Sequence, residues 1–192
     1  MTDASTAVHD DLLPLPLATE LAAKYADGRY RFYWRSSAAD QAPYFHWHID
    51  LVDKGPDNRE DLSGYLDTMK GLYNLEHHAW SLIRDGIFGG QAKLLRMYVN
   101  AYTYGTEGAP HQDSPHDDDV TAVCYLNAEW RPEWSGETVL FTPAGNDIER
   151  SVLPKLGRVF VFPAARLHAV RGMSRGCPHL RVVLAMKVAP AG

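Results

Sequence analysis

The sequence has only two cysteines, Cys124 and Cys177, among its 192 residues. Two thiols are too few for a disulfide framework, and they fit a reducing compartment. No run approaches the roughly 20 apolar residues that a membrane-spanning helix needs. Acidic side chains precede any apolar stretch at the start of the chain, so we expect no secretory signal. Together these absences predict a cytoplasmic protein without a membrane segment.

Basic residues are also outnumbered, with 19 Lys and Arg against 24 Asp and Glu and a formal net charge of -5. No Lys/Arg cluster offers a stripe for phosphate groups, which argues against nucleic-acid binding. A hydrophobic fraction of 45% and a charged fraction of 22% are ordinary for a globular protein. The length predicts one domain over residues 1–192. It leaves the oligomeric state open.

No internal repeat or low-complexity tract is present. We expect residues 1–92 to be a supporting part of helices and strands, and residues 93–190 to be a β core. Residues 1–16 are predicted to be irregular because they contain two prolines. The elements expected next are a helix over 18–26, strands over 30–34 and 44–52, and helical structure from Asp57 to Gly86, where Asp57 and Glu60 have capping-box spacing. One long helix or two shorter ones fit the last stretch.

From residue 94 onward, short apolar or alternating runs are separated by glycine and proline. They lie at 94–104, 119–128, 137–142, 147–153, 158–162, 167–171 and 180–188. Many short strands at this spacing predict a sandwich, barrel or jelly roll. The fold class is therefore α+β or mainly β, with N-terminal helices packed against a jelly-roll core.

Three side chains could form a metal site. His111 and Asp113 are two residues apart, so in an extended segment they lie on the same face. His168, at the start of a later strand, could supply a third ligand. Two His and one carboxylate leave open positions on the metal, as non-haem Fe(II) oxygenases require. Taken alone, Asp113 could equally be a turn or cap residue, and His168 a partly buried polar residue.

Other strands carry polar side chains on one face. In 180–188, Arg181 shares a face with Val183 and Ala185, and a buried guanidinium needs an anion or must reach solvent. Tyr125 shares the face of Thr121 and Val123. In 94–102 the even positions are polar or aromatic: Arg96, Tyr98, Asn100 and Tyr102. Such faces could line a pocket, although aromatic residues are common in strands anyway. His46 and His48 also have metal-like spacing, and we interpret them as structural or substrate-facing.

The stretch from Arg96 to Lys187 resembles the double-stranded β-helix core of the prolyl-4-hydroxylase-like oxygenases that depend on Fe(II) and 2-oxoglutarate. The resemblance covers about half of the chain. It lies in five segments, which follow one another in the family's order: NAYTYGTEGAPHQD, TAVCYLNAEW, WSGETVLF, PKLGRVFVFPAARLHAV and LRVVLAMKV.

The resemblance implies roles for individual residues. His111, Asp113 and His168 match the iron ligands. Arg181 and Tyr125 match the residues that hold the far carboxylate of 2-oxoglutarate, and Tyr102 matches a tyrosine near this co-substrate. Two alternatives stay open here. The SRGCPH segment before Arg181 looks like an insertion, so Arg175 could be the anion partner, and Tyr104 could replace Tyr102.

The implied activity is that of a dioxygenase, a hydroxylase that takes Fe(II), 2-oxoglutarate and O₂ and releases succinate and CO₂. The carboxylate of Asp113 argues against a halogenase, because related halogenases lack it. A small-molecule substrate is expected, with Asn100, Tyr98 and His116 as its candidate contacts. The alternatives are hydroxylation of a peptidyl residue, a zinc hydrolase and a non-catalytic jelly-roll binding protein. The sequence does not identify the C–H bond or the outcome of its oxidation.

Overall fold

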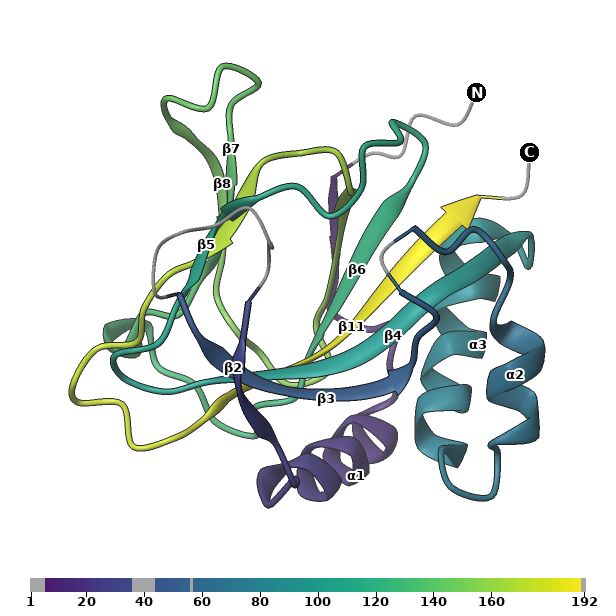
Figure 1. Cartoon of the computed structure of the whole chain (residues 1–192). Helices are drawn as coiled ribbons and strands as arrows, with labels where there is room; N and C mark the ends of the chain where they lie inside the picture. The colour runs from purple at the N-terminus through teal and green to yellow at the C-terminus, as the bar shows by residue number, and fades with distance from the viewer. Residues whose placement is uncertain (1–5, 36–43, 56, 191–192) are drawn as a thin grey trace.

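The computed structural model describes residues 6–35, 44–55 and 57–190, and two antiparallel sheets dominate them (Figure 1). The large sheet has seven strands in the order β1-β9-β6-β11-β4-β3-β2, and the small sheet has four in the order β5-β10-β7-β8. The predicted mainly-β architecture with a jelly-roll core is confirmed. Along the chain the elements are β1 (Ala7–His9), α1 (Leu15–Ala26), β2 (Arg31–Trp34), β3 (His46–Val52), α2 (Ser63–Thr68), α3 (Asn74–Phe88), β4 (Ala92–Tyr102), β5 (Gly108–His111), β6 (Val120–Tyr125), η1 (Pro132–Trp134), β7 (Thr138–Phe141), β8 (Ile148–Val152), β9 (Val159–Pro163), β10 (His168–Val170) and β11 (Arg181–Pro190).

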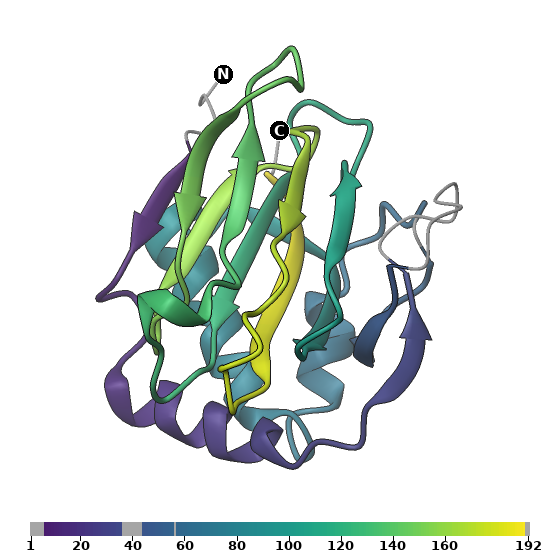
Figure 2. The same cartoon turned by 90° about the vertical axis from the view of Figure 1, so that its left-hand side faces the viewer.

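The main hydrophobic core lies between the helices and the large sheet. Helices α1 and α3 cover one face of this sheet, and the small sheet lies on its other face (Figures 1 and 2). Strand β11 shows how the sequence produces this arrangement, because its side chains alternate between the two faces. Val182, Leu184 and Met186 pack in the core beneath the helices, as their alternation predicts. The opposite face of β11 is therefore turned toward the small sheet.

A second apolar cluster joins the two sheets. It includes Val123 and Tyr125 of β6, Phe160 and Phe162 of β9, and Val183 of β11. These residues belong to the faces that alternation assigns away from the helices. The predicted division of β6 and β11 into two faces is therefore confirmed. The cluster fills only part of the space between the sheets, and the remaining space is a cavity.

The N-terminal stretch differs from the sequence prediction. Within residues 1–16, of which 1–5 lie outside the described residues, Ala7–His9 form β1 and pair with Val159–Val161 of β9. Helix α1 begins at Leu15 and includes Pro16 in its first turn. The prolines are compatible with this start because the first turn of a helix has no internal partners for its N–H groups. Proline here marks where the helix begins.

The stretch predicted to be helical from Asp57 to Gly86 contains two helices, α2 and α3. Of the two alternatives left open, two shorter helices are correct and one long helix is wrong. Helix α2 begins at Ser63 rather than at Asp57. Asp61 Oδ1 accepts hydrogen bonds from the Ser63 N–H at 2.9 Å and from the Ser63 hydroxyl at 2.7 Å. Helix α3 ends at Phe88 and is capped by Gly89, which has a φ of 59°, so the predicted end at Gly86 is wrong. A left-handed residue after the last turn is the usual place for glycine. Among the described residues, no helix has the length and apolar character to cross a membrane.

Candidate metal centre and cavity

The segments that carry His111, Asp113 and His168 meet in the small sheet. His111 ends β5 and His168 begins β10, and the two residues are directly paired in the ladder. Asp113 follows two residues after His111, where its N–H donates to the Ala164 carbonyl at 2.8 Å. One ligand atom from each of the three side chains lies within 4.8 Å of the others. The described residues contain no other group of this kind.

Hydrogen bonds orient both imidazoles. Nδ1 of His111 lies 2.7 Å from the Ala109 carbonyl, and Nδ1 of His168 lies 3.0 Å from the Arg166 carbonyl. A carbonyl only accepts, so each Nδ1 carries a proton and Nε2 is the nitrogen left for a metal. Burial lowers the pKa of His168 despite the attraction of Asp113, which favours the neutral form of this imidazole. Both Nε2 atoms lie 3.3 Å from a carboxylate oxygen of Asp113.

The carboxylate of Asp113 is held through one oxygen. Its Oδ2 accepts a hydrogen bond from Thr121 Oγ1 at 2.6 Å and forms an ion pair with the ammonium of Lys187. Burial alone would raise the pKa of Asp113, but the ammonium of Lys187 outweighs burial, and this pKa lies well below its usual range. The carboxylate is therefore ionised, and Oδ1 is the oxygen left for a cation. Two imidazoles and one carboxylate on the same side suit a metal ion with open positions.

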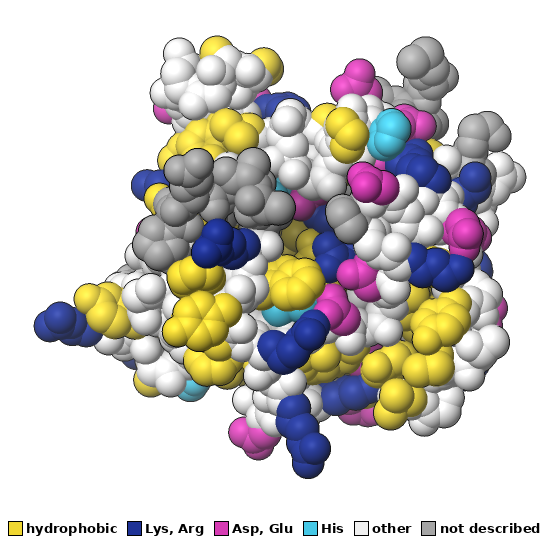
Figure 3. All heavy atoms as spheres, in the orientation of Figure 1, with side chains coloured by type: hydrophobic (Ala, Val, Ile, Leu, Met, Phe, Trp, Pro, Cys, Tyr) yellow, Lys and Arg dark blue, Asp and Glu magenta, His cyan; other side chains and the backbone are white. Residues whose placement is uncertain are grey.

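A cavity of about 600 Å³ lies between the sheets, and the three side chains are part of its wall. Even-numbered residues of β4 and odd-numbered residues of β11 also line it, together with Thr121 and Val123 of β6 and Thr138 of β7. Figure 3 shows one face of the molecule, on which acidic, basic and histidine side chains gather around its middle beside apolar ones. The alternation of the strands thus places polar groups along the cavity.

Arg181 is buried in the cavity wall with part of its guanidinium unsatisfied. Its Nε donates to the Gly136 carbonyl at 2.6 Å, and Nη2 donates to Thr138 Oγ1 at 2.7 Å. No side chain or backbone group among the described residues accepts a hydrogen bond from Nη1. The guanidinium also lies 5.4 Å from the Tyr102 ring centre and 5.3 Å from that of Tyr125. A buried guanidinium with a free N–H fits an anionic ligand such as a carboxylate.

Comparisons with known proteins agree with this geometry. Residues 97–186 match the family model described as the 2OG-Fe(II) oxygenase superfamily. The match contains β4 from its middle onward, both histidines of the triad, Asp113 and Arg181. The chain contains a 2OG-Fe(II) oxygenase domain. It is an oxygenase that takes Fe(II), 2-oxoglutarate and O₂, and the donor set described above fits such an iron.

Solved structures show the same fold in oxygenases with different reactions. A prolyl-4-hydroxylase from Pseudomonas putida is 23% identical, with a TM-score of 0.63 over 100% of this chain and 95% of that one. A Trichoplax adhaerens prolyl hydroxylase, solved with a peptide fragment of hypoxia inducible factor, is 18% identical (TM-score 0.58, 98% and 84% covered). The epimerase SnoN from nogalamycin biosynthesis is 15% identical (TM-score 0.61, 98% and 79% covered). No curated protein matches the sequence.

The tyrosines predicted for the co-substrate lie on two sides of Arg181 in the oxygenase. Tyr102 lines the cavity, and its ring also stacks on His46 with the centres 4.9 Å apart. Tyr125 does not line the cavity; it lies behind Thr138 and donates to Thr138 Oγ1 at 2.7 Å. Tyr125 therefore reaches a ligand only through Thr138 and Arg181. Sequence reasoning missed Thr138, although its place in the WSGETVLF segment offered a starting point.

Arg175 and Tyr104, the alternatives to Arg181 and Tyr102, lie elsewhere in the oxygenase. Arg175 stacks over the exposed ring of Tyr104, with its guanidinium 5.6 Å from the ring centre. Neither residue lines the cavity. The two alternatives therefore belong together, outside the wall that carries Arg181 and Tyr102.

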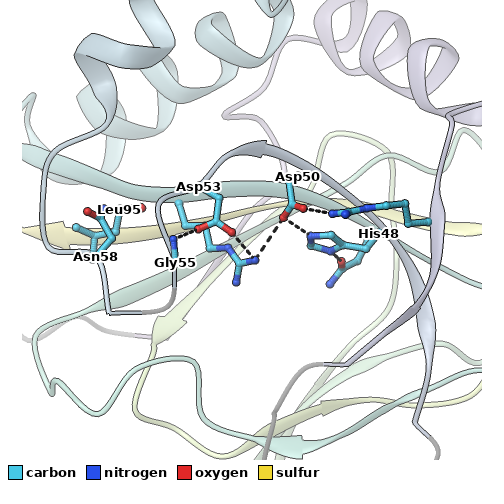
Figure 4. A network of polar contacts seen from close by, with 9 residues as sticks. His48, Asp50, Asp53, Gly55, Asn58 and Leu95 are labelled. Atoms are coloured by element: carbon cyan, nitrogen blue, oxygen red, sulfur yellow. Dashed lines mark hydrogen bonds and ion pairs between the residues drawn. The ribbon is translucent and has the colours of Figure 1, made fainter.

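All three residues predicted to contact substrate, Tyr98, Asn100 and His116, line the cavity. Figure 4 shows a polar network around His48 and Asp50, and Asn100 joins this network through its contact with His48. His48 lies between Asn100 Oδ1 at 2.6 Å and Asp50 Oδ1 at 2.7 Å. Arg96 continues the network, with its Nη2 at 3.5 Å from Asp50 and 2.8 Å from Asp53. Asn100 is thus held in place by contacts behind the cavity wall.

Two further residues line the cavity: His46, which the sequence analysis interpreted as structural or substrate-facing, and Lys187, which it did not select. His46 is fully buried, and neither ring nitrogen has a hydrogen-bond partner among the described residues. Burial lowers its pKa to about 3, so the imidazole is neutral. Lys187 was the next residue in the alternation of Arg181, Val183 and Ala185, and that period of two could have identified it. Burial opposes its charge, but Asp113 outweighs burial and the pKa of Lys187 is raised.

Proposed function

We propose that the oxygenase hydroxylates an unactivated C–H bond of a small molecule and that His111, Asp113 and His168 are its iron ligands. The observation that carries this proposal is the convergence of three metal-ligating atoms within 4.8 Å in the wall of a cavity that also holds Arg181. A structural role alone does not require the ligating atoms of two imidazoles and an ionised carboxylate to converge within 4.8 Å in a cavity wall. It would also leave the free N–H of a buried guanidinium without a reason.

In this proposal Arg181 binds the far carboxylate of 2-oxoglutarate. Its Nη1 is available, while Nε and Nη2 are fixed by Gly136 and Thr138. Thr138 Oγ1 accepts from both Arg181 and Tyr125, so its own proton remains for the ligand. Tyr125 thus acts by positioning Thr138, and Tyr102 covers the guanidinium from the cavity side. The placement of Arg175 outside the cavity supports Arg181 as the anion partner.

When bound, Fe(II) and 2-oxoglutarate supply the oxidising chemistry, with O₂ as oxidant and succinate and CO₂ as products. The side chains of this protein orient the reactants and keep competing reactions out. Thr121 and Lys187 fix the carboxylate of Asp113 through Oδ2. Val183 and Ala185 line the cavity between Arg181 and Lys187, and their apolar side chains exclude water there.

The cavity supports a small molecule as the substrate. Its volume of about 600 Å³ falls within the range of roughly 300–1,000 Å³ that small-molecule sites occupy. It is lined by side chains of both sheets, so a ligand is enclosed on several sides. A peptidyl substrate is the alternative that the experiment below also tests, because the Trichoplax relative was solved with a peptide.

The test is to load the metal-free protein with Fe(II) without oxygen and to titrate in 2-oxoglutarate while recording the weak visible charge-transfer band of the chelate. We expect the band in the wild type, its loss in Asp113→Ala, and a strongly raised half-saturation concentration in Arg181→Ala. Arg175→Ala is the matched control for charge, and it should behave as the wild type. A wild-type protein without the band would contradict the proposal.

Succinate release then separates the two substrate classes. We expect small molecules, and not proline-containing peptides, to stimulate succinate formation by the loaded enzyme above its basal rate. Stimulation by peptides alone would contradict the small-molecule part of the proposal and leave the metal site unaffected.

A further inference from the structure

Strand β11 presents two cations to the same cavity. Arg181, Val183, Ala185 and Lys187 all line it, so the row begins and ends with a positive charge and is apolar between them. Arg181 and Lys187 are six residue steps apart, which is roughly 20 Å along a strand, so the two cations lie at separate ends of the row. If Arg181 holds the co-substrate, Lys187 is left facing the space where a substrate binds.

The surroundings of Lys187 keep it charged and partly accessible. Its side chain is 13% exposed, and its ammonium forms an ion pair with Asp113. The same ammonium lies 3.3 Å from Thr121 Oγ1 and 5.7 Å from the ring centre of Tyr98. Asp113 is therefore the single acidic partner of Lys187 among the described residues, and in the loaded enzyme this carboxylate is shared with the metal.

Two arginines of the cavity wall already have acidic partners. Arg96 lies 2.8 Å from Asp53, and Arg59 lies 2.5 Å from Asp119. These pairs contribute no net charge to the cavity. The charges on the metal-ligating side chains and on the cavity face of β11 are those of Asp113, Lys187 and Arg181.

This balance leaves one positive charge uncompensated once the proposed cofactors are bound. Asp113 contributes one negative charge, whereas Lys187 and Arg181 contribute two positive charges. Fe(II) adds two positive charges and 2-oxoglutarate two negative charges, so these cancel. A buried charge without a partner is strongly unfavourable, and a single anionic group on the substrate would remove it.

We propose that the substrate carries one carboxylate group and that this group binds the ammonium of Lys187. The inference rests on the proposed function, because the charge balance includes the metal and 2-oxoglutarate. A monoanion completes the balance, whereas a phosphate monoester, which carries nearly two charges at neutral pH, would exceed it. His46 adds a neutral donor and acceptor to the same wall, and its unpartnered nitrogens also call for a polar ligand.

The position of Lys187 also limits which C–H bond reacts. Because Lys187 touches Asp113, the bound carboxylate lies beside the metal site. The carbon that is hydroxylated is therefore expected within a few bonds of the carboxylate. Long acids oxidised at their far end would not fit this geometry.

The experiment compares matched acids and amides as probes: acetate with acetamide, cyclohexanecarboxylate with its amide, and benzoate with benzamide. Binding to the protein loaded with Fe(II) and saturating 2-oxoglutarate is measured by calorimetry without oxygen. We expect at least one acid to bind the wild type about tenfold more tightly than its amide, the gain that one charge-assisted hydrogen bond supplies. In Lys187→Met the acid should lose this advantage and bind no more tightly than its amide.

Lys93→Met is the matched control, because Lys93 is an exposed lysine on the neighbouring strand β4 and the variant has the same net charge. It should keep the acid preference. No acid preference in the wild type, or a preference that survives in Lys187→Met, would overturn the inference. The chelate band needs no probe and is recorded first, so its absence counts against the proposed function and its presence without acid preference counts against this inference alone.

Discussion

Two pairs of residues with the same spacing have different fates in this oxygenase. His46 and His48 lie two apart on β3, and His111 and Asp113 lie two apart at the end of β5. All four side chains are largely buried. Within each pair, the spacing of two places both side chains on one face of an extended segment. Only the second pair meets a third ligand, because the ladder between β5 and β10 brings His168 opposite His111. Spacing alone therefore does not make a metal site.

The second difference lies in what the ring nitrogens contact. His48 has Asn100 at one nitrogen and the Asp50 carboxylate at the other, so no lone pair is left for a metal. In His111 and His168 a backbone carbonyl engages Nδ1, and Nε2 lies 3.3 Å from a carboxylate oxygen of the third ligand, Asp113. A side-chain network thus occupies both nitrogens of His48, whereas backbone carbonyls orient His111 and His168 toward a cation.

The largest effect that separates the two pairs is on metal affinity. We expect His111→Ala to weaken Co(II) binding by more than about 100-fold, beyond the roughly 10- to 100-fold cost of losing a supporting partner. His46→Ala should change it by less than about threefold, because His46 is not one of the three converging side chains. Titration of the metal-free protein with Co(II), followed by visible absorption, measures both. Comparable losses in the two variants would contradict the assignment.

His46, of the first pair, should instead affect the free energy of unfolding and make it depend on pH. The folded-state pKa of His46 is about 3 and its unfolded value is near 6.5, so below pH 6.5 the unfolded chain binds a proton that the folded one excludes. Stability is therefore lost as the pH falls. From pH 7.5 to pH 5.0 this single group should cost about 2 kcal/mol of unfolding free energy. Urea unfolding of the metal-free protein at the two pH values measures the loss.

His46→Gln is the control for this prediction, because glutamine keeps a donor and an acceptor but does not titrate. The variant should lose about 2 kcal/mol less than the wild type over the same pH interval. His48, His168 and Asp113 also titrate differently in the folded protein, but they do so in both proteins and cancel in the difference. Equal losses would show that His46 is not buried in its neutral form.

The comparison also shows what the sequence can and cannot predict. The period of two in 94–102 and 180–188 was enough to place Asn100, Tyr102 and Arg181 on the cavity side. The short strand β5 was missed because its four residues, GAPH, have no alternation and include a proline. Contacts between distant segments, such as the ion pair of Lys187 with Asp113, depend on the strand order and leave no local pattern.

The predicted start of the second helical stretch at Asp57 is wrong because it too depends on a contact between distant segments. Asp57 and Glu60 have capping-box spacing, but the residue that engages the first turn of α2 is Asp61, which also accepts a hydrogen bond from the Leu94 N–H. The tertiary contact with β4 thus decides which aspartate is used. The division of the chain at residue 92 stays a prediction.

The smallest effect concerns the support of the second pair. Thr121→Val removes the hydrogen bond to Asp113 Oδ2 while keeping the shape of the side chain, and we expect Co(II) affinity to fall about tenfold. Thr121→Ser keeps the hydroxyl and should stay within about threefold of the wild type. Asn100→Ala, which removes the matching support from His48, should leave Co(II) affinity unchanged. An effect of Asn100→Ala as large as that of Thr121→Val would mean that the two networks are coupled, and the division between a structural pair and a metal-binding pair would fail.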